Sequence, residues 1–226
     1  MNQSTEDYLK SIYHLQIRLA AEHAAKAEEQ VVPTSVLAKH LKIGDGSVTD
    51  MVKKLSEKQL INYEPYQGVT LTEAGRRVAL KMVRRHRLWE MFLVKFLGYT
   101  WDEIHDEAEL LEHVTSDEME IRLDKALGYP KVDPHGDPIP TADGVLKKIT
   151  YRRLSQCDAR DAGIIVRVSD ESQEALQLLT KLGLGLNKKV QVKQKVKFDG
   201  SVIVNVGRKE IPLSPLLAKS IFVEIL

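Results

Sequence analysis

The chain has 226 residues, of which 43% are hydrophobic and 29% charged, and its formal net charge is +1. This balance is typical of a globular protein with room for two or three modest domains, and it excludes a polycation that binds nucleic acid through bulk charge. A single cysteine, Cys157, excludes an intrachain disulfide and fits a reducing compartment. Because the N-terminus has no signal-peptide pattern and no apolar run reaches the length of a membrane span, we expect a cytoplasmic protein.

The amino-terminal third carries the pattern of a winged helix. Residues 5–28 have apolar side chains at three- and four-residue steps, which predicts a helix. Two short amphipathic segments follow, on either side of a glycine-containing turn at 43–46, and this is the outline of a helix-turn-helix. Residues 60–63 and 69–71 predict two short strands around a turn. The order helix, helix, hairpin therefore predicts a winged helix.

The middle of the chain is expected to be helical and its end to be strands. A basic helix is predicted from Thr72 to about Leu97, and a helix or helix pair over 102–127. Closely spaced prolines between 129 and 140 end this part, and His135 in that segment is interpreted as structural. A short helix is expected near 174–182. The remaining pattern predicts a small SH3-like β-barrel with strands at 164–168, 189–197, 201–206, 209–213 and 221–225.

The segment HDEAELLEHVTSDEMEIRL, residues 105–123, mixes two histidines with many carboxylates. On a helix, Glu109, Glu112 and His113 share a stripe about 100° wide with His105. Residues 102–124 hold ten Asp and Glu against one Arg, a crowding that requires solvent or a bound cation. A solvated acidic face is one interpretation. Histidine among carboxylates is also the ligand chemistry of Mn²⁺, Fe²⁺, Co²⁺ or Zn²⁺.

A second pair of the same kind lies on the preceding predicted helix. His86 and Glu90 are four residues apart and therefore on one face. A lone pair of this type is usually structural. Two adjacent helices that both present such pairs favour divalent metal sites between them.

Several stretches of the chain resemble the diphtheria-toxin-repressor family of metal-dependent transcriptional regulators, and its manganese-sensing branch in particular. The similarity covers nearly the whole length. It is carried by STEDYLKSIYHL, GSVTDMVKKLSEKQLI, VTLTEAGRRVAL, RRHRLWE, IHDEAELLEHVTSDEME and HGDPIP.

The resemblance implies an α+β fold of three parts joined by a linker. These are a winged helix-turn-helix DNA-binding domain (1–73), a helical dimerisation and metal-binding domain (74–141), a linker (142–150) and an SH3-like domain (151–226). It implies a homodimer that binds a palindromic operator on double-stranded DNA and represses metal-uptake genes. It also implies two metal sites per subunit, for Mn²⁺ or Fe²⁺, and no enzymatic activity.

The resemblance also implies the metal ligands. The primary, activating site is Asp7, Glu109, Glu112 and His113. The ancillary site is His86, Glu90 and His105, closed by Glu171 and Glu174. Asp170 and Gln173 are the alternatives, because the alignment of the segment SDESQEAL with the family is loose.

Two departures from relatives affect the choice of metal. Asp7 and Glu109 stand where iron-responsive relatives have sulfur ligands, and hard oxygen donors suit Mn²⁺, although Fe²⁺ accepts the same set. Lys10 stands where some manganese sensors have a further carboxylate, which argues against a two-metal cluster of their kind.

The second helix of the helix-turn-helix is predicted to read DNA. Its phase directs Ser47, Thr49 and Asp50 to the major groove, and Lys53 and Lys54 to phosphates, unless these lysines form a solvated helix face. Basic residues only slightly exceed acidic ones over 1–85, so affinity is expected to depend on local placement and dimerisation. The predicted DNA-contacting residues are Thr34, Ser35, Gly46, Ser47, Thr49, Asp50, Lys53 and Lys54.

These features lead to a mechanistic hypothesis with two rivals. A divalent ion cancels repulsion among the carboxylates and pins the first helix to the dimerisation domain, so that two reading helices match successive major grooves. One rival is a metalloenzyme, against which the chain lacks a nucleophile elbow, a P-loop, a dinucleotide fingerprint and HExxH. The other is a metal-storage or metal-handling module without DNA binding, which leaves the winged helix unexplained.

Overall fold

The computed structural model describes residues 2–23, 26–147 and 150–226, in two compact units. Unit 1 contains Met1–His86, Glu112–Thr115 and Pro140–Val145, and unit 2 contains Arg87–Leu111, Ser116–Ile139 and Leu146–Leu226. Part of the predicted linker, residues 148–149, lies outside the described residues. Helices α4 (Glu73–Leu97) and α5 (Ile104–Val114) each contribute to both units.

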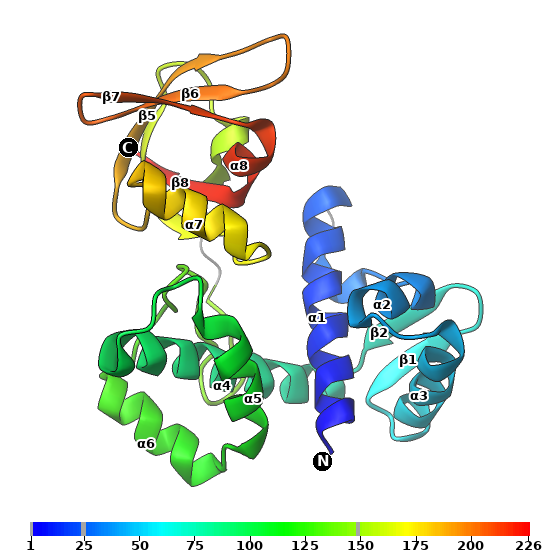
Figure 1. Ribbon diagram of the computed structural model, residues 1–226. Helices are drawn as coiled ribbons and strands as arrows, with labels where there is room; N and C mark the ends of the chain where they lie inside the picture. Colours follow the sequence, from blue (N-terminus) through cyan, green and yellow to red (C-terminus); the bar gives the residue numbers. More distant parts are fainter. Residues whose placement is uncertain (1, 24–25, 148–149) are drawn as a thin grey trace. The chain divides into compact units, whose positions relative to one another are not determined.

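Unit 1 is a winged helix, as predicted. Figure 1 shows α2 and α3 beside each other, with the β1–β2 hairpin next to α3. The helix expected over 5–28 is described over Gln3–His23, and a 3₁₀ turn lies at Ala27–Glu29. Residues 24–25 of that prediction lie outside the described residues. The elements before α4 are α1 (Gln3–His23), η1 (Ala27–Glu29), α2 (Thr34–Leu41), α3 (Asp45–Glu57), β1 (Ile61–Glu64) and β2 (Gly68–Leu71).

The core of unit 1 explains which face of α3 is exposed. Val48, Val52 and Leu55 recur at the helical period and are fully buried among apolar residues of α1 and α2. The opposite side of α3 therefore faces solvent. The hairpin is fixed to the helices by the bridge between Val32 and Val69, and Gly68 is required there because a Cβ atom would lie 2.3 Å from the carbonyl oxygen of Val32.

The helical part of unit 2 contains the predicted helix pair. Helix α5 is followed by α6 (Asp117–Leu127), and the break between them is set by Ser116, whose hydroxyl accepts a hydrogen bond from the amide of Met119 at 3.1 Å. The second half of α4 packs Leu88 against Leu123 and Leu127 of α6. These contacts make α4 and α6 one small hydrophobic layer.

The rest of unit 2 is an antiparallel sheet in the order β3-β8-β4-β5-β6-β7, which confirms the predicted α+β class with an SH3-like domain. Its core joins buried valines of the strands to Leu176 and Leu179 of α7. Cys157 is buried there, and burial raises the pKa of its thiol. The elements are β3 (Arg152–Arg153), η2 (Leu154–Gln156), β4 (Ala162–Val168), α7 (Gln173–Leu182), β5 (Lys189–Lys195), β6 (Val202–Val206), β7 (Lys209–Leu213), α8 (Pro215–Ser220) and β8 (Ile221–Ile225).

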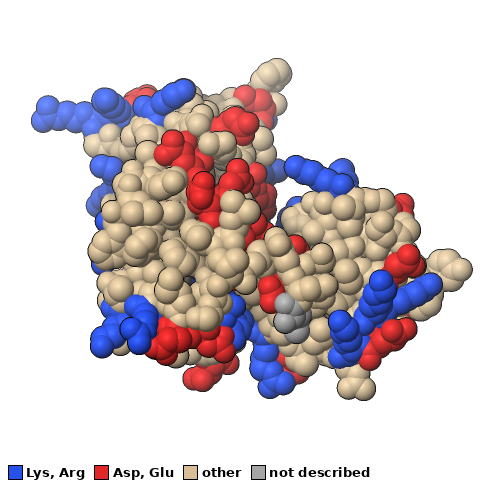
Figure 2. Space-filling view, turned by 60° about the horizontal axis from the view of Figure 1, so that its bottom comes forward, with Lys and Arg blue, Asp and Glu red and all other residues tan. Residues whose placement is uncertain are grey.

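Two global features agree with the composition. Within the described ranges, no helix is both long and apolar enough to cross a membrane. On the face drawn in Figure 2, Lys and Arg side chains lie in several separate groups, with Asp and Glu side chains among them.

Candidate metal centres and nucleic-acid interface

The end of α5 contacts α1 inside unit 1, and His113 is at the centre of this contact. Its Nδ1 donates a hydrogen bond to Oε2 of Glu6 at 2.8 Å. Its Nε2 lies 2.8 Å from Oδ1 of Asp7 and 3.6 Å from Oε1 of Glu112. Three residues of the predicted primary site, Asp7, Glu112 and His113, therefore lie together. The fourth, Glu109, lies one turn earlier on α5, in the part of that helix that belongs to unit 2.

The hydrogen bond between His113 Nδ1 and Glu6 leaves Nε2 as the ring nitrogen that a metal ion could bind. Because Glu6 accepts the hydrogen of Nδ1, the lone pair of the neutral ring is on Nε2. That buried Nε2 makes no hydrogen bond within the part of the chain that the structure describes, although it faces a carboxylate oxygen. A carboxylate that holds the second nitrogen of a metal-binding histidine is a common arrangement. The sequence does not predict this contact of Glu6, although Glu6 adjoins the predicted ligand Asp7.

Glu112 is fully buried and forms a network with Lys10 and His86. The Lys10 Nζ lies 2.8 Å and 2.7 Å from the two carboxylate oxygens of Glu112. The Nδ1 of His86 lies 2.6 Å from Oε2 of Glu112. The Lys10 Nζ also lies 3.1 Å from this Nδ1, so the nitrogen either accepts a hydrogen bond from Lys10 or donates one to Glu112. All three residues belong to unit 1.

In unit 2, the predicted ancillary ligands Glu90 and His105 form a group with Asp170. Ligand atoms of the three residues all lie within 4.8 Å of one another. Asp170 was one of the two alternatives in the loose register. Neither of the first choices is in this group: the amide of Glu171 donates to the hydroxyl of Ser169, and the exposed carboxylate of Glu174 accepts from the hydroxyl of Ser172. Gln173, the other alternative, is the first residue of α7.

A second group in unit 2 shares Glu90 and adds Asp133 and His135, and all three are buried. The Nε2 of His135 donates to the carbonyl oxygen of Trp101 at 2.7 Å, so the lone pair is on Nδ1. That Nδ1 lies 3.9 Å from Oε1 of Glu90 and has no hydrogen-bond partner among the described residues. The position of His135 in the proline-rich segment predicts a structural role for it. A sequence signal that indicates a metal ligand instead is the spacing in DPHGDP, where His135 follows Asp133 by two residues.

Burial and like charge act together on Asp133. Desolvation raises the pKa of this carboxyl well above its ordinary value, and the charges of Asp137 and Glu90 raise it further. Arg87, 3.3 Å from Oδ2 of Asp133, opposes the shift. The turn is held in place because Oδ1 of Asp133 accepts hydrogen bonds from the amides of His135 and Asp137, both at 2.9 Å.

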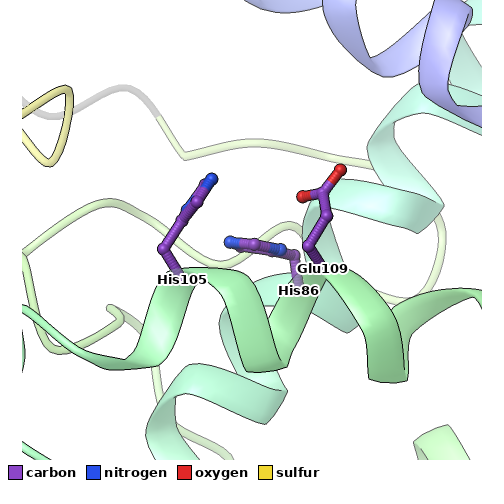
Figure 3. Close-up of side chains that lie close together, drawn as sticks. All are labelled: His86, His105 and Glu109. Atoms are coloured by element: carbon purple, nitrogen blue, oxygen red, sulfur yellow. The ribbon is translucent and has the colours of Figure 1, made fainter.

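Figure 3 shows how the remaining predicted ligands leave their helices. His105 and Glu109 project from the same side of α5, one turn apart, as expected for residues four apart on a helix. His86 projects from α4. Each of these side chains offers a nitrogen or oxygen atom that Mn²⁺ and Fe²⁺ accept.

The predicted DNA-contacting residues lie on the solvent side of α2 and α3. Ser35, Gly46, Ser47, Asp50, Lys53 and Lys54 are exposed, and Thr34 and Thr49 are half-buried. The hydroxyl of Thr49 donates to the carbonyl oxygen of Asp45 at 2.9 Å, so it can still accept a hydrogen bond from a base. This surface presents small polar groups near the start of α3 and two lysines a turn later.

Family comparisons match the chain in three consecutive parts. Residues 1–69 match the "Iron dependent repressor, N-terminal DNA binding domain". Residues 72–141 match the "Iron dependent repressor, metal binding and dimerisation domain". Residues 152–225 match the FeoA domain.

Individual proteins are similar over nearly the full length. The iron-dependent repressor IdeR of Mycobacterium tuberculosis is 30% identical, covering 98% of this chain and 96% of that protein. The diphtheria toxin repressor of Corynebacterium glutamicum is 28% identical over the same shares. A manganese-dependent transcriptional repressor in complex with manganese is 38% identical with a TM-score of 0.87, covering 98% of this chain and all of that one. ScaR with bound Zn²⁺ is 34% identical with a TM-score of 0.79, covering all of both chains.

Proposed function

Because this chain belongs to the diphtheria-toxin-repressor family of metal-dependent regulators, we propose that the contact between α1 and the end of α5 holds its activating metal. The protein is a metal-activated, DNA-binding transcriptional repressor with a dimerisation domain. It is not an enzyme, and the storage interpretation is also excluded by this membership.

The ligands that we propose for the activating ion are Asp7, Glu109, Glu112 and His113. The observation that supports this assignment is the pair of contacts of His113: its Nδ1 donates to Glu6, and its buried Nε2 faces Asp7 at 2.8 Å. Glu109 joins the set in this proposal because its side chain leaves α5 one turn before His113. The set contains three carboxylates and one imidazole.

We propose that further metal binding centres on Glu90. This buried carboxylate belongs to both groups of potential ligands in unit 2, one with His105 and Asp170 and one with Asp133 and His135. His86 completes the former group in our assignment, and Asp170 replaces Glu171 and Glu174. The exposed position of Glu174 and its hydrogen bond with Ser172 support that change.

The donor atoms favour Mn²⁺, with Fe²⁺ as the second candidate. Every proposed ligand offers a carboxylate oxygen or an imidazole nitrogen, and none offers sulfur. Hard oxygen donors suit Mn²⁺, whereas thiolate favours softer or later metals. The similarity to a repressor solved with manganese agrees with this preference.

The mechanism that we propose is electrostatic. A bound dication supplies the positive charge that lets carboxylates of α1 and α5 approach without repulsion. Asp7 then holds the first turn of α1, while His113 and Glu112 hold the end of α5. Because α1 shares its core with α2 and α3, ordering α1 also orders the reading helix. In the homodimer, two α3 helices reach successive major grooves of a palindromic operator.

Calorimetric titration with Mn²⁺ tests the ligand assignment. Asp7→Asn keeps the size and a hydrogen-bonding oxygen but removes the charge, so we expect the loss of one ion per subunit or at least a tenfold weaker Kd. Asp50→Asn, the same substitution at an exposed position of α3, is the matched control and should titrate as the unmodified protein does. Identical isotherms for Asp7→Asn and the unmodified protein contradict the assignment.

A further inference from the structure

Lys10 lies one turn after Asp7 on α1, and its ammonium group is inside the α1–α5 contact. The residue is only 7% exposed, although lysine is rarely buried without a partner. Its Nζ lies 2.8 Å and 2.7 Å from the two oxygens of Glu112 and 3.1 Å from Nδ1 of His86. The ammonium therefore binds both oxygens of a carboxylate that the metal site needs.

The buried carboxylate requires such a partner. Glu112 is 0% exposed, and an isolated ionised carboxylate in the interior is strongly unfavourable unless it is paired and hydrogen-bonded. Lysine supplies a compact positive charge with three donors, which can serve both oxygens at once. The charge of Glu112 is thus compensated inside unit 1 by a residue of the chain itself.

The same geometry limits where a metal can bind. Oxygen ligands lie about 2.0–2.6 Å from Mg²⁺ or Ca²⁺, so a divalent ion of this size held by both oxygens of Glu112 would overlap the ammonium group. The Nε2 of His113 lies 3.6 Å from Oε1 of Glu112, so these two atoms are close enough to bind one ion together. Glu112 can then give one oxygen to an ion that His113 and Asp7 also bind, while Lys10 keeps its contact.

We propose that Lys10 is a resident cation of this site: it compensates Glu112 without metal and takes the place beside that carboxylate where a second ion would bind. The primary site then holds one ion. Before that ion arrives, Lys10 already joins the second turn of α1 to Glu112, and the ion adds the attachment of the first turn through Asp7. This inference rests on the proposed function for the ion count, but its metal-free consequence does not depend on metal binding at all.

Two variants test the two halves of the proposal in the full-length protein. Lys10→Met removes the charge and keeps the length, so we expect the metal-free unfolding midpoint to fall by on the order of 10 °C. Arg18→Met, on an exposed position of α1, is the matched control and should stay within about 2 °C of the unmodified protein. Lys10→Gln, which retains donors, should give an intermediate midpoint and provides a folded variant if Lys10→Met does not fold.

The second half of the proposal concerns the number of ions that each subunit binds. Calorimetric titration with Mn²⁺ alone measures this number. Lys10→Glu replaces the resident cation with a carboxylate, so we expect one more ion per subunit than in the unmodified protein and a larger rise of the unfolding midpoint with Mn²⁺. An unchanged metal-free midpoint in both Lys10→Met and Lys10→Gln overturns the proposal, and so does an unchanged ion count in Lys10→Glu. A failure of the proposed function alone appears differently, as unaltered Mn²⁺ binding in Asp7→Asn together with the expected metal-free effect of Lys10→Met.

Discussion

The α1–α5 contact of unit 1 and the 133–137 turn of unit 2 both gather carboxylates around a histidine, but they balance the charge differently. In unit 1, the positive charge of Lys10 compensates the negative charge of Glu112, and these two residues are 102 positions apart in the chain. In unit 2, Asp133 is held by amides of its own turn, and burial raises the pKa of its carboxyl.

Because of this difference, we expect the α1–α5 contact to change its geometry when metal binds, whereas the 133–137 turn is already formed without metal. Side chains of separate helices make the α1–α5 contact, so its geometry changes whenever α1 moves. The turn around Asp133 is packed more tightly: Gly136 has φ +90°, and a Cβ atom there would lie 2.0 Å from the carbonyl oxygen of Val166. We therefore expect metal at the first region to control DNA binding and metal at the second to act mainly on stability.

The largest expected effect is the loss of stability when one partner of the Lys10–Glu112 ion pair is removed. Glu112→Ala leaves the ammonium of Lys10 in the interior without its carboxylate, so we expect the free energy of unfolding of the metal-free protein to fall by about 3–5 kcal/mol. Urea unfolding measures this. Glu57→Ala, an exposed glutamate at the end of α3, is the control and should change stability by less than about 0.5 kcal/mol. A loss below about 1 kcal/mol for Glu112→Ala would mean that the pair does not hold unit 1 together.

A smaller effect is expected from His135, in the second region. His135→Gln retains an amide that can donate to Trp101 but loses the Nδ1 lone pair. If Mn²⁺ binds there, a concentration of about 100 Kd adds about 2.7 kcal/mol to the stability of the unmodified protein, and the variant should lose that gain. Unfolding with and without Mn²⁺ measures it, with His40→Gln as the control. An equal gain in His135→Gln would exclude this group as a metal site.

The raised pKa of Asp133 gives the second region a pH dependence. A carboxyl whose pKa is higher in the folded state contributes stability below its unfolded pKa, near 3.9, and loses that contribution as pH rises through its folded pKa. Asp133→Asn removes the titration and keeps an oxygen for the two amides. In metal-free buffer, the variant should therefore gain stability relative to the unmodified protein as pH rises from about 4, by at most about 1.4 kcal/mol per pH unit.

Unfolding at a series of pH values measures this difference. Asp50→Asn is the matched control, since it removes an exposed carboxyl of α3. A stability difference between Asp133→Asn and the unmodified protein that is constant with pH, or that changes in the opposite direction, would contradict the role assigned to burial.

The smallest expected effect concerns the reading helix. If Lys53 contacts a phosphate, Lys53→Gln should weaken binding to all DNA sequences by a few-fold and reduce the slope of log K against log salt concentration by about 0.9. Fluorescence anisotropy with Mn²⁺ at several salt concentrations measures the slope. Lys58→Gln, beyond the end of α3, is the control. An unchanged slope in Lys53→Gln would leave this lysine as part of a solvated face.

The sequence predicted most of the fold because its elements have strong periodicity or turn signals. The winged helix and the strands from residue 162 to 225 follow hydrophobic patterns. The helix α8 was not expected, since it has only six residues, although Ser214 and Pro215 form a recognisable helix start. The extended backbone of Lys26, which interrupts the helix predicted over 5–28, was not visible in the alanine-rich sequence around it.

The site was predictable only in part, for a physical reason. Helical spacing places Glu109, Glu112 and His113 on one side of α5, so local sequence was informative. The roles of Glu6 and Lys10 depend on the contact between α1 and the end of α5, which no local pattern specifies. Likewise, the inclusion of Asp170 instead of Glu174 depends on where the turn before α7 lies, and the sequence does not determine that register.

The central claim is that metal at the α1–α5 contact increases affinity for DNA, and Asp7 tests it most directly. DNA binding is measured with and without Mn²⁺, on a duplex selected from a random library by the unmodified repressor. With a coupling of about 1–3 kcal/mol for each of two primary sites, Mn²⁺ should raise the affinity of the unmodified dimer roughly a hundredfold. The account predicts that Asp7→Asn loses most of this gain while its metal-free affinity is unchanged. A gain in Asp7→Asn equal to that of the unmodified protein would contradict it.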